Sequence, residues 1–329
     1  MIKAMLLHLG SNMWNEWLPE EVNRDEFLQA KRIPARKLQL DEGDWRKATD
    51  RRVRQGIDTL LIDLGDAMVF PSHPELAIEG SWSPDRMKAE IARLKAQGVT
   101  AYPKLNFSTT HDGWLKDYHR MVSTPAYYKV VKDVIRDTAE VFGTPELFHI
   151  GFDEERAEWS GGLNYYVARQ GDLWWHDYLY TIKCVEDCGC RAWVWSDVGP
   201  HKPDYCERCP KSVMQTAWYY DAYNAKLSMD KTKNPHWWKL QNFIDLEKAG
   251  FDQIPCGTNW IGHVRRRLGV NGDDVMGLVT RFCRANVSPD RLKGFLMAPW
   301  AMSDGKPENL EKNLKGIDLF KDALADAGF

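Results

Sequence analysis

Three consecutive acidic residues, Asp153, Glu154 and Glu155, follow a short apolar segment near the middle of the chain. The apolar segment, residues 147–151, has the composition of a buried strand. Adjacent side chains cannot all face the same way, so we expect Asp153 and Glu154 to have different roles. A carboxyl group that is removed from water keeps its proton to a higher pH, which suits it to act as a general acid near neutral pH. Alternatively, the acids only cap the next segment or pair with Arg156.

Tryptophan is unusually abundant, with 15 residues among 329. The flat face of an indole can stack on the apolar C–H face of a sugar ring, although a large barrel also buries tryptophan in its core. The positions of the tryptophans along the chain therefore decide between these two interpretations.

Short apolar segments alternate with longer amphipathic stretches along the whole chain, which predicts parallel βα units. The expected strands are residues 4–9, 59–64, 100–105, 147–151, 192–196, 213–218, 253–259 and 294–300. The expected helices are residues 84–97, 125–142, 172–187, 237–248, 273–285 and 308–327. Ser83 and Thr124, each followed by proline, are expected to cap the first two of these helices.

Eight such units predict an α/β fold, a single (β/α)₈ TIM barrel that forms one domain over residues 1–329. No linker or internal repeat divides the chain. The fifth unit leaves only residues 197–212 between two strands. This is too short for a full helix and two loops, so we expect the fifth helix to be abbreviated.

Active sites of such barrels lie at the C-terminal ends of the strands. Carboxylate, amide, imidazole and aromatic side chains follow nearly every expected strand, which is the composition of a sugar-binding site and favours a carbohydrate as partner. The expected lining residues are Asn12, Trp14, Trp17, Asp66, His73, Asn106, His111, His149, Trp195, Asp197, Trp218, Tyr219, Tyr220, Asp221, Asn259, Trp260, Trp300 and Asp304.

Net charge and hydropathy exclude several other partners. The formal net charge of −3 gives no reason to expect nucleic acid or an anionic membrane surface. No run of about 18 apolar residues indicates a membrane span. Residues 1–8 are too short and turn polar too soon for a signal peptide, so cytoplasmic, periplasmic and secreted locations all stay open. No cofactor is expected.

The chain has seven cysteines, an odd number. Cys188 and Cys190, with Cys206 and Cys209, could be free thiols, disulfides or zinc ligands. The first pair is separated by one residue, whereas structural zinc sites usually have two to four residues between paired cysteines.

The region around the acids resembles the catalytic barrel of the family 20 glycoside hydrolases, the β-N-acetylhexosaminidases. Their strand-four signature is His-x-Gly-Gly-Asp-Glu, and this chain has His149-Ile150-Gly151-Phe152-Asp153-Glu154. Their Tyr-Pro-Glu-Leu stretch after strand two is matched by His73-Pro74-Glu75-Leu76. Their Pro-Glu-x-Asp-x-Pro-Gly-His run on strand three is matched at Pro103 and His111. The resemblance is ordered over residues 57–155 and continues loosely to Trp300, as in a divergent relative.

The resemblance implies an exo-acting glycosidase for terminal N-acetylhexosamine or a related sugar, with substrate-assisted, retaining catalysis. Glu154 would protonate the leaving oxygen and later activate water. Asp153 would orient the 2-acetamido group, whose carbonyl oxygen attacks the anomeric carbon. Tyr219 or Tyr220 would donate a hydrogen bond to that oxygen. The wall of the sugar pocket would be formed by Trp218, Trp260 and Trp300. The acids would be held in place by His111 and His149.

The chain also departs from the family pattern, and these departures leave the exact sugar open. Phe152 replaces the second glycine of the motif. The arginine that members use on strand one to bind sugar hydroxyls is missing, and His8, Asn12 and Trp14 lie there instead. Lys104 and Asn106 stand where the family has acids on strand three.

The sequence is also compatible with mechanisms other than substrate assistance. Many retaining barrel glycosidases have a nucleophilic glutamate at the end of strand seven, but residues 253–260 end without a carboxylate. An inverting pair, with Asp197, Asp221 or Asp304 as base, is compatible with the residues present. Two further functions are compatible with the residues present. One is a carbohydrate-binding barrel without catalysis, and the other is a metal-dependent hydrolase that uses His8, His73, His111 and His149.

Overall fold

The structure, a computed structural model, describes residues 1–16, 33–157, 165–220, 229–260 and 272–329. Eight parallel strands form one sheet in the order β6-β5-β4-β3-β2-β1-β8-β7. Isolated bridges Gln215↔Gln253 and Trp218↔Cys256 join its two edges and close it into a barrel. The (β/α)₈ prediction is therefore confirmed. The strands are β1 (Ile2–His8), β2 (Thr59–Asp63), β3 (Thr100–Lys104), β4 (Leu147–His149), β5 (Arg191–Trp195), β6 (Met214–Thr216), β7 (Cys256–Gly257) and β8 (Gly294–Met297).

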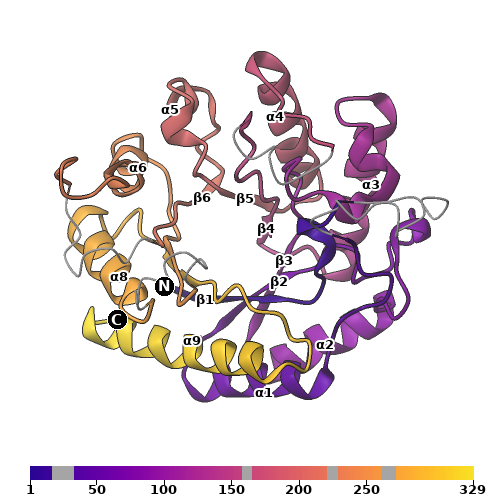
Figure 1. Ribbon diagram of the computed structural model, residues 1–329, viewed down its shortest axis with the longest axis horizontal. Coiled ribbons are helices and arrows are strands. Elements are labelled where there is room, and N and C mark those ends of the chain that lie inside the picture. The colour runs from indigo at the N-terminus through magenta and orange to yellow at the C-terminus, as the bar shows by residue number, and fades with distance from the viewer. Residues whose placement is uncertain (17–32, 158–164, 221–228, 261–271) are drawn as a thin grey trace.

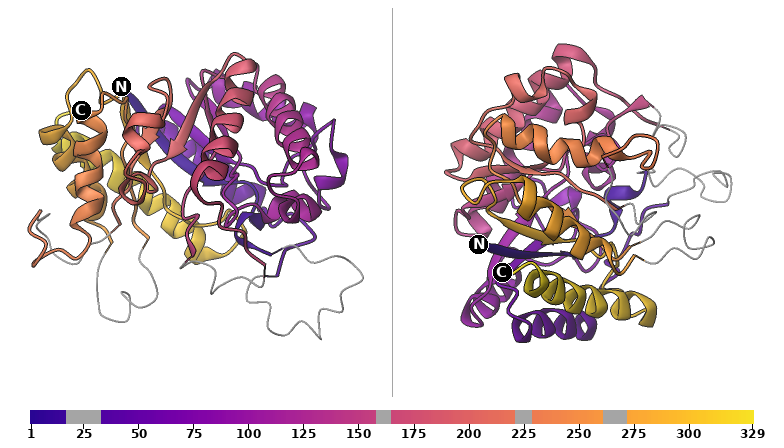
Figure 2. Two further views of the ribbon diagram at one scale, coloured as in Figure 1. Left: turned by 90° about the horizontal axis from the view of Figure 1, so that it is seen from above. Right: turned by 90° about the vertical axis from the view of Figure 1, so that its left-hand side faces the viewer.

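Helices surround the sheet (Figure 1). They are α1 (Glu42–Arg54), α2 (Pro84–Ala96), α3 (Pro125–Val141), α4 (Gly171–Asp187), α5 (Tyr205–Arg208), α6 (Trp237–Lys248), α8 (Val275–Asn286) and α9 (Pro307–Asp326). The expected abbreviation of the fifth helix is confirmed, because α5 has only four residues. The two chain ends lie close together (Figure 2). The ring of the last residue, Phe329, packs against that of Phe295 in β8, with ring centres 5.5 Å apart. In the described ranges, no helix is both long and apolar enough to cross a membrane.

The predicted N-caps of two helices are confirmed. The Ser83 hydroxyl accepts a hydrogen bond from the Arg86 N–H at 3.2 Å, and the Thr124 hydroxyl accepts one from the Tyr127 N–H at 3.3 Å. Each cap satisfies an N–H that has no partner within its own helix.

Helix α1 was not among the expected helices. Asp41 caps it, accepting from the Asp44 N–H at 2.8 Å. Most of its residues are polar, and the buried face depends mainly on Trp45 and Ala48. Such a short apolar stripe gives a weak periodic signal, which is why the sequence pattern missed it.

Alternate residues of each strand point to opposite sides of the barrel wall, as in any β-strand. In β1, Met5 and Leu7 pack outward against the helices, while Ala4 and Leu6 fill the barrel interior. Each fully buried Leu or Met side chain of this kind contributes about 1.5–3 kcal/mol. The alternation decides which residues beyond each strand reach the barrel mouth.

Several strands end earlier than the sequence predicted. The pairing of β4 stops at His149 and that of β8 at Met297. Beyond these points Gly151 has φ +73° and Trp300 has φ +52°, so the chain leaves the ladder and turns into the mouth. The early strand ends therefore coincide with the candidate site.

Candidate active site

The acidic segment after β4 forms a sharp turn whose backbone is held by its neighbours. Phe152 and Glu154 have φ of +71° and +59°, values that are uncommon for residues other than glycine. A Cβ at Gly151 would lie 1.9 Å from Asn106 Oδ1, so this position requires glycine. The Phe152 ring turns outward and packs edge-on against Tyr178, with ring centres 5.0 Å apart. The bulky departure from the family motif is thus accommodated away from the mouth.

Asp153 is oriented by the amide of Asn106. Its Oδ1 accepts a hydrogen bond from Asn106 Nδ2 at 2.7 Å. The other amide atom, Asn106 Oδ1, accepts from the N–H groups of Ser108 at 3.0 Å and Phe152 at 3.2 Å. Because both ends of the amide are occupied, its orientation is fixed. Asn106 therefore holds the turn and the carboxylate together.

Glu154 lies beside Asp153 with about a quarter of its side chain exposed, 23%. Burial, together with the nearby charges of Asp153 and Asp197, raises the pKa of Glu154 to about 8. The Glu154 N–H donates to Asp197 Oδ2 at 3.0 Å. Burial also raises the pKa of Asp197 to about 7, with a further contribution from Asp153. Glu154 is consequently protonated at neutral pH.

His111 faces both acids. Its Nε2 lies 3.9 Å from Asp153 Oδ2 and 3.7 Å from Glu154 Oε2. Its Nδ1 is 2.7 Å from the hydroxyl of Thr110, which also donates to the backbone oxygen of Asp153 at 3.3 Å. Sequence reasoning did not single out Thr110, because a lone threonine in a loop carries no distinguishing signal.

Glu155 points away from the mouth and forms a buried ion pair. Its carboxylate receives Arg169 Nε at 2.7 Å and Nη2 at 2.6 Å, and both side chains are fully buried. Arg169 also donates to the backbone oxygen of Phe107 at 2.8 Å and to Asp177 at 3.1 Å. The sequence analysis did not identify Arg169 as a functional residue. The partner of the third acid is therefore Arg169, not Arg156.

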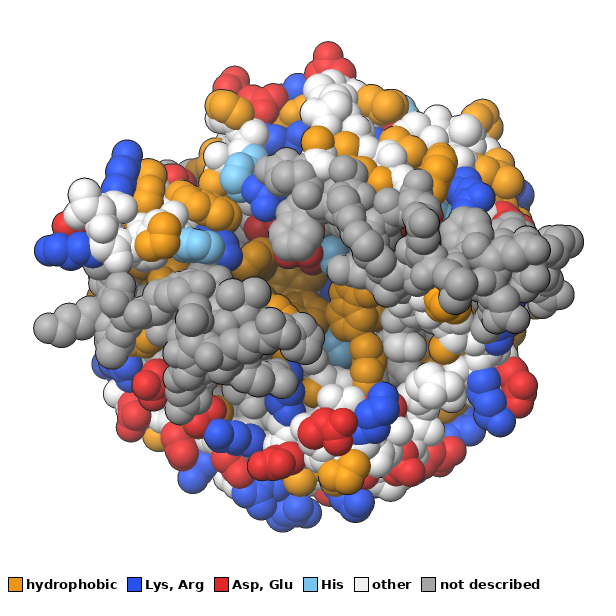
Figure 3. Space-filling view, in the orientation of Figure 1, with side chains coloured by type: hydrophobic (Ala, Val, Ile, Leu, Met, Phe, Trp, Pro, Cys, Tyr) orange, Lys and Arg blue, Asp and Glu red, His pale blue; other side chains and the backbone are white. Residues whose placement is uncertain are grey.

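Aromatic side chains line the mouth around Trp300. Its ring centre lies 6.0 Å from that of Trp14, 5.8 Å from that of Trp195 and 6.3 Å from that of Tyr220. Tyr220 in turn stacks on Trp218 at 4.6 Å. The face shown in Figure 3 is hollowed near its centre, with hydrophobic side chains at the bottom. Trp14, Trp218 and Trp300 are half-buried and so leave part of their flat apolar surface open, whereas Trp195 is fully buried.

The two neighbouring tyrosines lie on opposite sides of the barrel wall. Tyr219 packs into the hydrophobic layer between strands and helices. Tyr220 belongs to the interior cluster, and its hydroxyl lies 3.4 Å from Cys256 Sγ. Of the two residues proposed to contact an acetamido group, Tyr220 is the one that faces the interior.

Two other expected lining residues, Asn259 and Asp304, form hydrogen bonds with α9 and with the residue before it. The Asn259 amide donates to the backbone oxygen of Lys312 at 2.9 Å. Asp304 accepts from Lys306 Nζ at 2.6 Å and from Asn309 Nδ2 at 2.8 Å. The Asn259 Nδ2 and the Asp304 carboxylate are thus engaged with α9 and the residue before it.

Asp66 and His149 are also engaged with their neighbours. Asp66 Oδ2 accepts from Asn12 Nδ2 at 2.6 Å, and burial raises the pKa of Asp66 to about 7. His149 Nδ1 accepts the Gly151 N–H at 3.0 Å, so it fixes the backbone of the acidic turn and contacts neither carboxylate in the hydrogen bonds described. Trp260 is half-buried, and its backbone N–H donates to Thr258 Oγ1 at 2.8 Å. The expected residues Trp17 and Asp221 lie outside the described residues.

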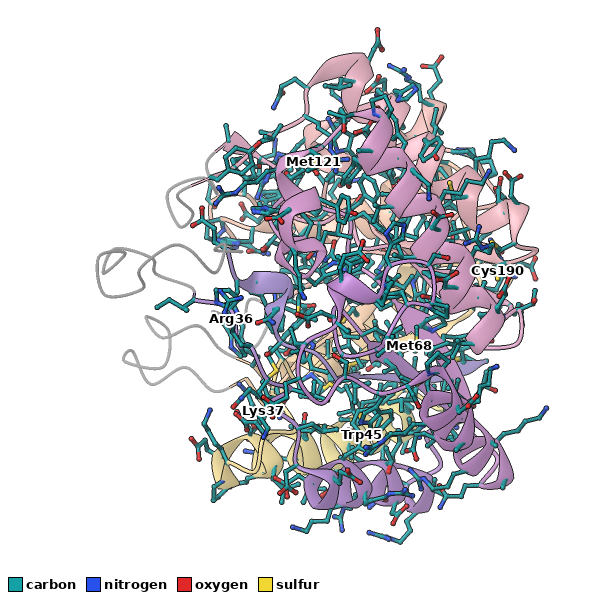
Figure 4. All side chains as sticks on the ribbon, turned by 90° about the vertical axis from the view of Figure 1, so that its right-hand side faces the viewer. Arg36, Lys37, Trp45, Met68, Met121 and Cys190 are labelled. Carbon is teal, nitrogen blue, oxygen red and sulfur yellow. The ribbon has the colours of Figure 1, made fainter. Side chains whose placement is uncertain are left out.

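All seven cysteines are free thiols, so the disulfide interpretation is wrong. Cys190 lies on the opposite side of the molecule from Arg36 and Lys37 (Figure 4), at the N-terminal end of β5. Within the described ranges, the donor atoms that could share a metal ion belong to His111, Asp153 and Glu154, all within 4.8 Å of one another, and no cysteine joins them.

His8 and His73 do not converge with His111. His73 lies 2.8 Å from Glu75 and 3.2 Å from Asp133, and His8 contacts Asp63. The four histidines of the metal-hydrolase hypothesis are therefore not one cluster.

The fold was compared with known proteins. No family model and no curated protein sequence match the chain. Among solved structures, an exo β-N-acetylglucosaminidase from Vibrio harveyi in complex with N-acetylglucosamine aligns with TM-score 0.59 and 11% identity over 96% of this chain. A mutant Streptomyces plicatus β-hexosaminidase in complex with its product aligns with TM-score 0.62 and 11% identity over 97%. Dispersin B aligns with TM-score 0.58 and 13% identity over 98%.

The barrel has the family 20 glycoside hydrolase fold. At these identities, the similarity shows the fold alone. The chain spans 54% of the length of the Vibrio enzyme and 63% of the Streptomyces enzyme, but 98% of Dispersin B. Within this fold, the two acids of the strand-four motif lie at the barrel mouth, directly after the outward-turned Phe152.

Proposed function

We propose that this protein is a glycoside hydrolase that removes a terminal N-acetylhexosamine or a related sugar by substrate-assisted, retaining catalysis. The observation that carries the proposal is the pairing of Asp153 and Glu154 in one turn at the mouth. Asp153 accepts an amide hydrogen bond from Asn106, as suits a carboxylate, while the pKa of Glu154 is raised to about 8. A carboxyl with a raised pKa can act as a general acid, and a neighbouring carboxyl held by a hydrogen bond can orient the substrate.

In the first step, the carbonyl oxygen of the substrate's acetamido group forms a bond to the anomeric carbon. The bond from this carbon to the leaving oxygen breaks, and Glu154 gives its proton to that oxygen. Asp153 accepts a hydrogen bond from the acetamido N–H and stabilises the positive charge that develops on the ring formed. In the second step, the Glu154 carboxylate takes a proton from water, whose oxygen bonds to the anomeric carbon and releases the acetamido oxygen.

The aromatic rings support a sugar as substrate. Trp14, Trp218 and Trp300 are half-buried, and a pyranose ring stacks on flat indole faces of this kind. Tyr220 faces the interior and is the candidate donor to the acetamido oxygen.

An inverting mechanism with Asp197 as base has less support. Asp197 Oδ2 is occupied by the Glu154 N–H. The same carboxyl is buried, and the pKa of Asp197 is raised to about 7. Asp304, a second candidate base, is engaged by Lys306 and Asn309. Both carboxyls have structural partners, and we therefore favour the acetamido group as the nucleophile. Asp221, the third candidate base, lies outside the described residues.

The proposal is tested by hydrolysis of four aryl β-glycosides: the N-acetylglucosaminide, the N-acetylgalactosaminide, the glucoside and the galactoside. The expected result is turnover of acetamido sugars only, and its loss in Glu154→Gln. Equal turnover of the plain glycosides would overturn substrate assistance. A complete lack of turnover, with sugar binding retained, would instead support the non-catalytic carbohydrate-binding barrel.

A further inference from the structure

One buried guanidinium contacts the residues on both sides of the Asp153–Glu154 pair. The ring of Phe152, directly before the pair, faces Arg169, with the guanidinium carbon 5.1 Å from the ring centre. Glu155, directly after the pair, accepts hydrogen bonds from Nε and Nη2 of the same arginine at 2.7 and 2.6 Å. Both ends of the segment that carries the acids are therefore held by one cation.

Arg169 is anchored independently of this segment. Its Nη2 donates to the backbone oxygen of Phe107, in the loop after β3, at 2.8 Å, and its Nη1 donates to Asp177 of α4 at 3.1 Å. Asp177 in turn accepts from the hydroxyls of Tyr128 at 2.6 Å and Ser123 at 2.7 Å. The side chains of Arg169 and Asp177 are at most 1% exposed. The guanidinium thus has a fixed position to which the acidic turn is attached.

Glu155 also connects the acidic turn to the loop that carries His111. Its Oε2 accepts the backbone N–H of Thr109 at 3.2 Å, and its Oε1 accepts that of Arg169 at 3.2 Å. Thr109 lies two residues before His111, the side chain that faces both acids. The Glu155 carboxylate therefore fixes the acidic turn and the His111 loop relative to each other.

The backbone of the acidic turn requires such support. Phe152 and Glu154 have φ of +71° and +59°, a conformation that costs free energy in a residue with a side chain. The motif His-x-Gly-Gly-Asp-Glu has glycine at the position of Phe152, and glycine adopts positive φ without this cost. In this chain, contacts made by the flanking side chains can offset the cost.

We propose that Arg169 is a positioning residue, which through the two flanking side chains imposes the turn that keeps the Glu154 carboxyl beside His111. Its guanidinium is fully buried, and among the described residues it makes no hydrogen bond to the Asp153 or Glu154 side chain. It therefore acts only through its neighbours. The inference rests on the proposed function, because it takes the placement of these carboxyls to govern turnover.

Three variants weaken the attachment of the turn, and a fourth is the control. Glu155→Gln keeps the shape of the side chain but removes its charge, Phe152→Leu removes the aromatic face, and Arg169→Gln removes the cation. Glu90→Gln is the matched control, because Glu90 is also a buried glutamate that accepts two hydrogen bonds from one arginine. That arginine is Arg93, at 2.9 and 2.6 Å, and the pair lies on α2, outside the barrel wall.

The measurements are kcat for an aryl N-acetylglucosaminide and the Kd for N-acetylglucosamine, at a temperature where circular dichroism shows each variant folded. Glu155→Gln and Arg169→Gln should lower kcat by about 10-fold or more, since small displacements of catalytic groups have large effects on rate. Phe152→Leu should lower kcat by about 3-fold, because a cation–π contact is weaker than an ion pair. The Kd should change little, whereas Glu90→Gln should keep the wild-type kcat even if its melting temperature falls. If Arg169→Gln does not fold, Glu155→Gln and Phe152→Leu decide the question.

Wild-type kcat in folded Glu155→Gln and Phe152→Leu would overturn the positioning role. An equal loss of kcat in Glu90→Gln would also overturn it, because the effect would then follow from stability alone.

The turn is also observed without turnover, in crystal structures of wild type and Glu155→Gln. The Glu154 N–H lies 3.0 Å from Asp197 Oδ2 in wild type, and it should leave this oxygen in the variant. Loss of this contact in a protein that hydrolyses no glycoside would support the positioning role and remove the proposed function. Hydrolysis by wild type, with an unchanged turn and unchanged kcat in the variant, would remove the positioning role alone.

Discussion

Asp197 Oδ2 accepts the backbone N–H of Glu154 at 3.0 Å and so holds a residue whose φ is +59°. Such a backbone conformation costs on the order of 1–3 kcal/mol for a residue with a side chain, and it persists only where the surroundings enforce it. The hydrogen bond keeps the Glu154 carboxyl beside His111 and Asp153. It also places the charge of Asp197 close enough to raise the pKa of Glu154.

Glu154→Gln keeps the shape of the side chain but removes the proton that the leaving oxygen needs. We expect kcat/KM for an aryl N-acetylglucosaminide to fall by about 10²–10⁴-fold, the usual contribution of a positioned acid. The Kd for N-acetylglucosamine should change little. Activity at the wild-type level in this variant would remove Glu154 from the mechanism.

Asp153→Asn should lower kcat strongly, by about 10²-fold or more, because the carboxylate no longer stabilises the charge on the acetamido group. The melting temperature should stay close to that of wild type, since the Asn106 amide can still bond an amide oxygen at this position. Asp318→Asn is the control. It removes a carboxylate that pairs with Arg51 on the outside of the barrel, and it should leave kcat unchanged.

The raised pKa of Glu154 sets the basic limb of the pH profile. The acid form is the active form, so kcat/KM should be constant at neutral pH and fall as pH rises through about 8. Asp197→Asn removes a negative charge that disfavours ionisation of Glu154, so it should move this limb to lower pH. A limb that stays in place in Asp197→Asn would contradict the electrostatic coupling of these two residues.

Arg169→Met should destabilise the protein by about 3–5 kcal/mol, because it leaves the Glu155 carboxylate buried without its partner. Arg51→Met is the matched control, since it breaks the partly exposed pair with Asp318 and should destabilise the protein much less. Urea denaturation of both variants measures the difference. Equal losses would show that burial of the Glu155–Arg169 pair adds nothing.

The barrel and the position of the acids could be predicted from the sequence for physical reasons. Buried parallel strands are nearly continuous apolar runs, and residues beyond their C-terminal ends must lie at one mouth. This rule placed Asp153 and Glu154 there without any knowledge of tertiary contacts. The proline and hydroxyl signals at Ser83 and Thr124 worked because capping is local.

Side-chain direction and long-range partners could not be predicted in this way. Tyr219 and Tyr220 differ only by one residue, and the strand register decides which of them faces inward. Arg169 follows Glu155 by 14 residues, and its role depends on the path of the intervening chain. Asn259 has the expected residue type at a strand end, yet its amide turns outward to the backbone of α9.

The most direct test of substrate assistance compares an aryl N-acetylglucosaminide with its N-trifluoroacetyl analogue on the wild-type enzyme. Fluorine withdraws electrons from the acetamido oxygen and weakens it as a nucleophile, while the leaving group and the ring hydroxyls stay the same. If this oxygen attacks the anomeric carbon between Asp153 and Glu154, kcat/KM for the fluorinated substrate should fall by about 10²-fold or more. Equal kcat/KM for the two substrates would contradict the proposed mechanism.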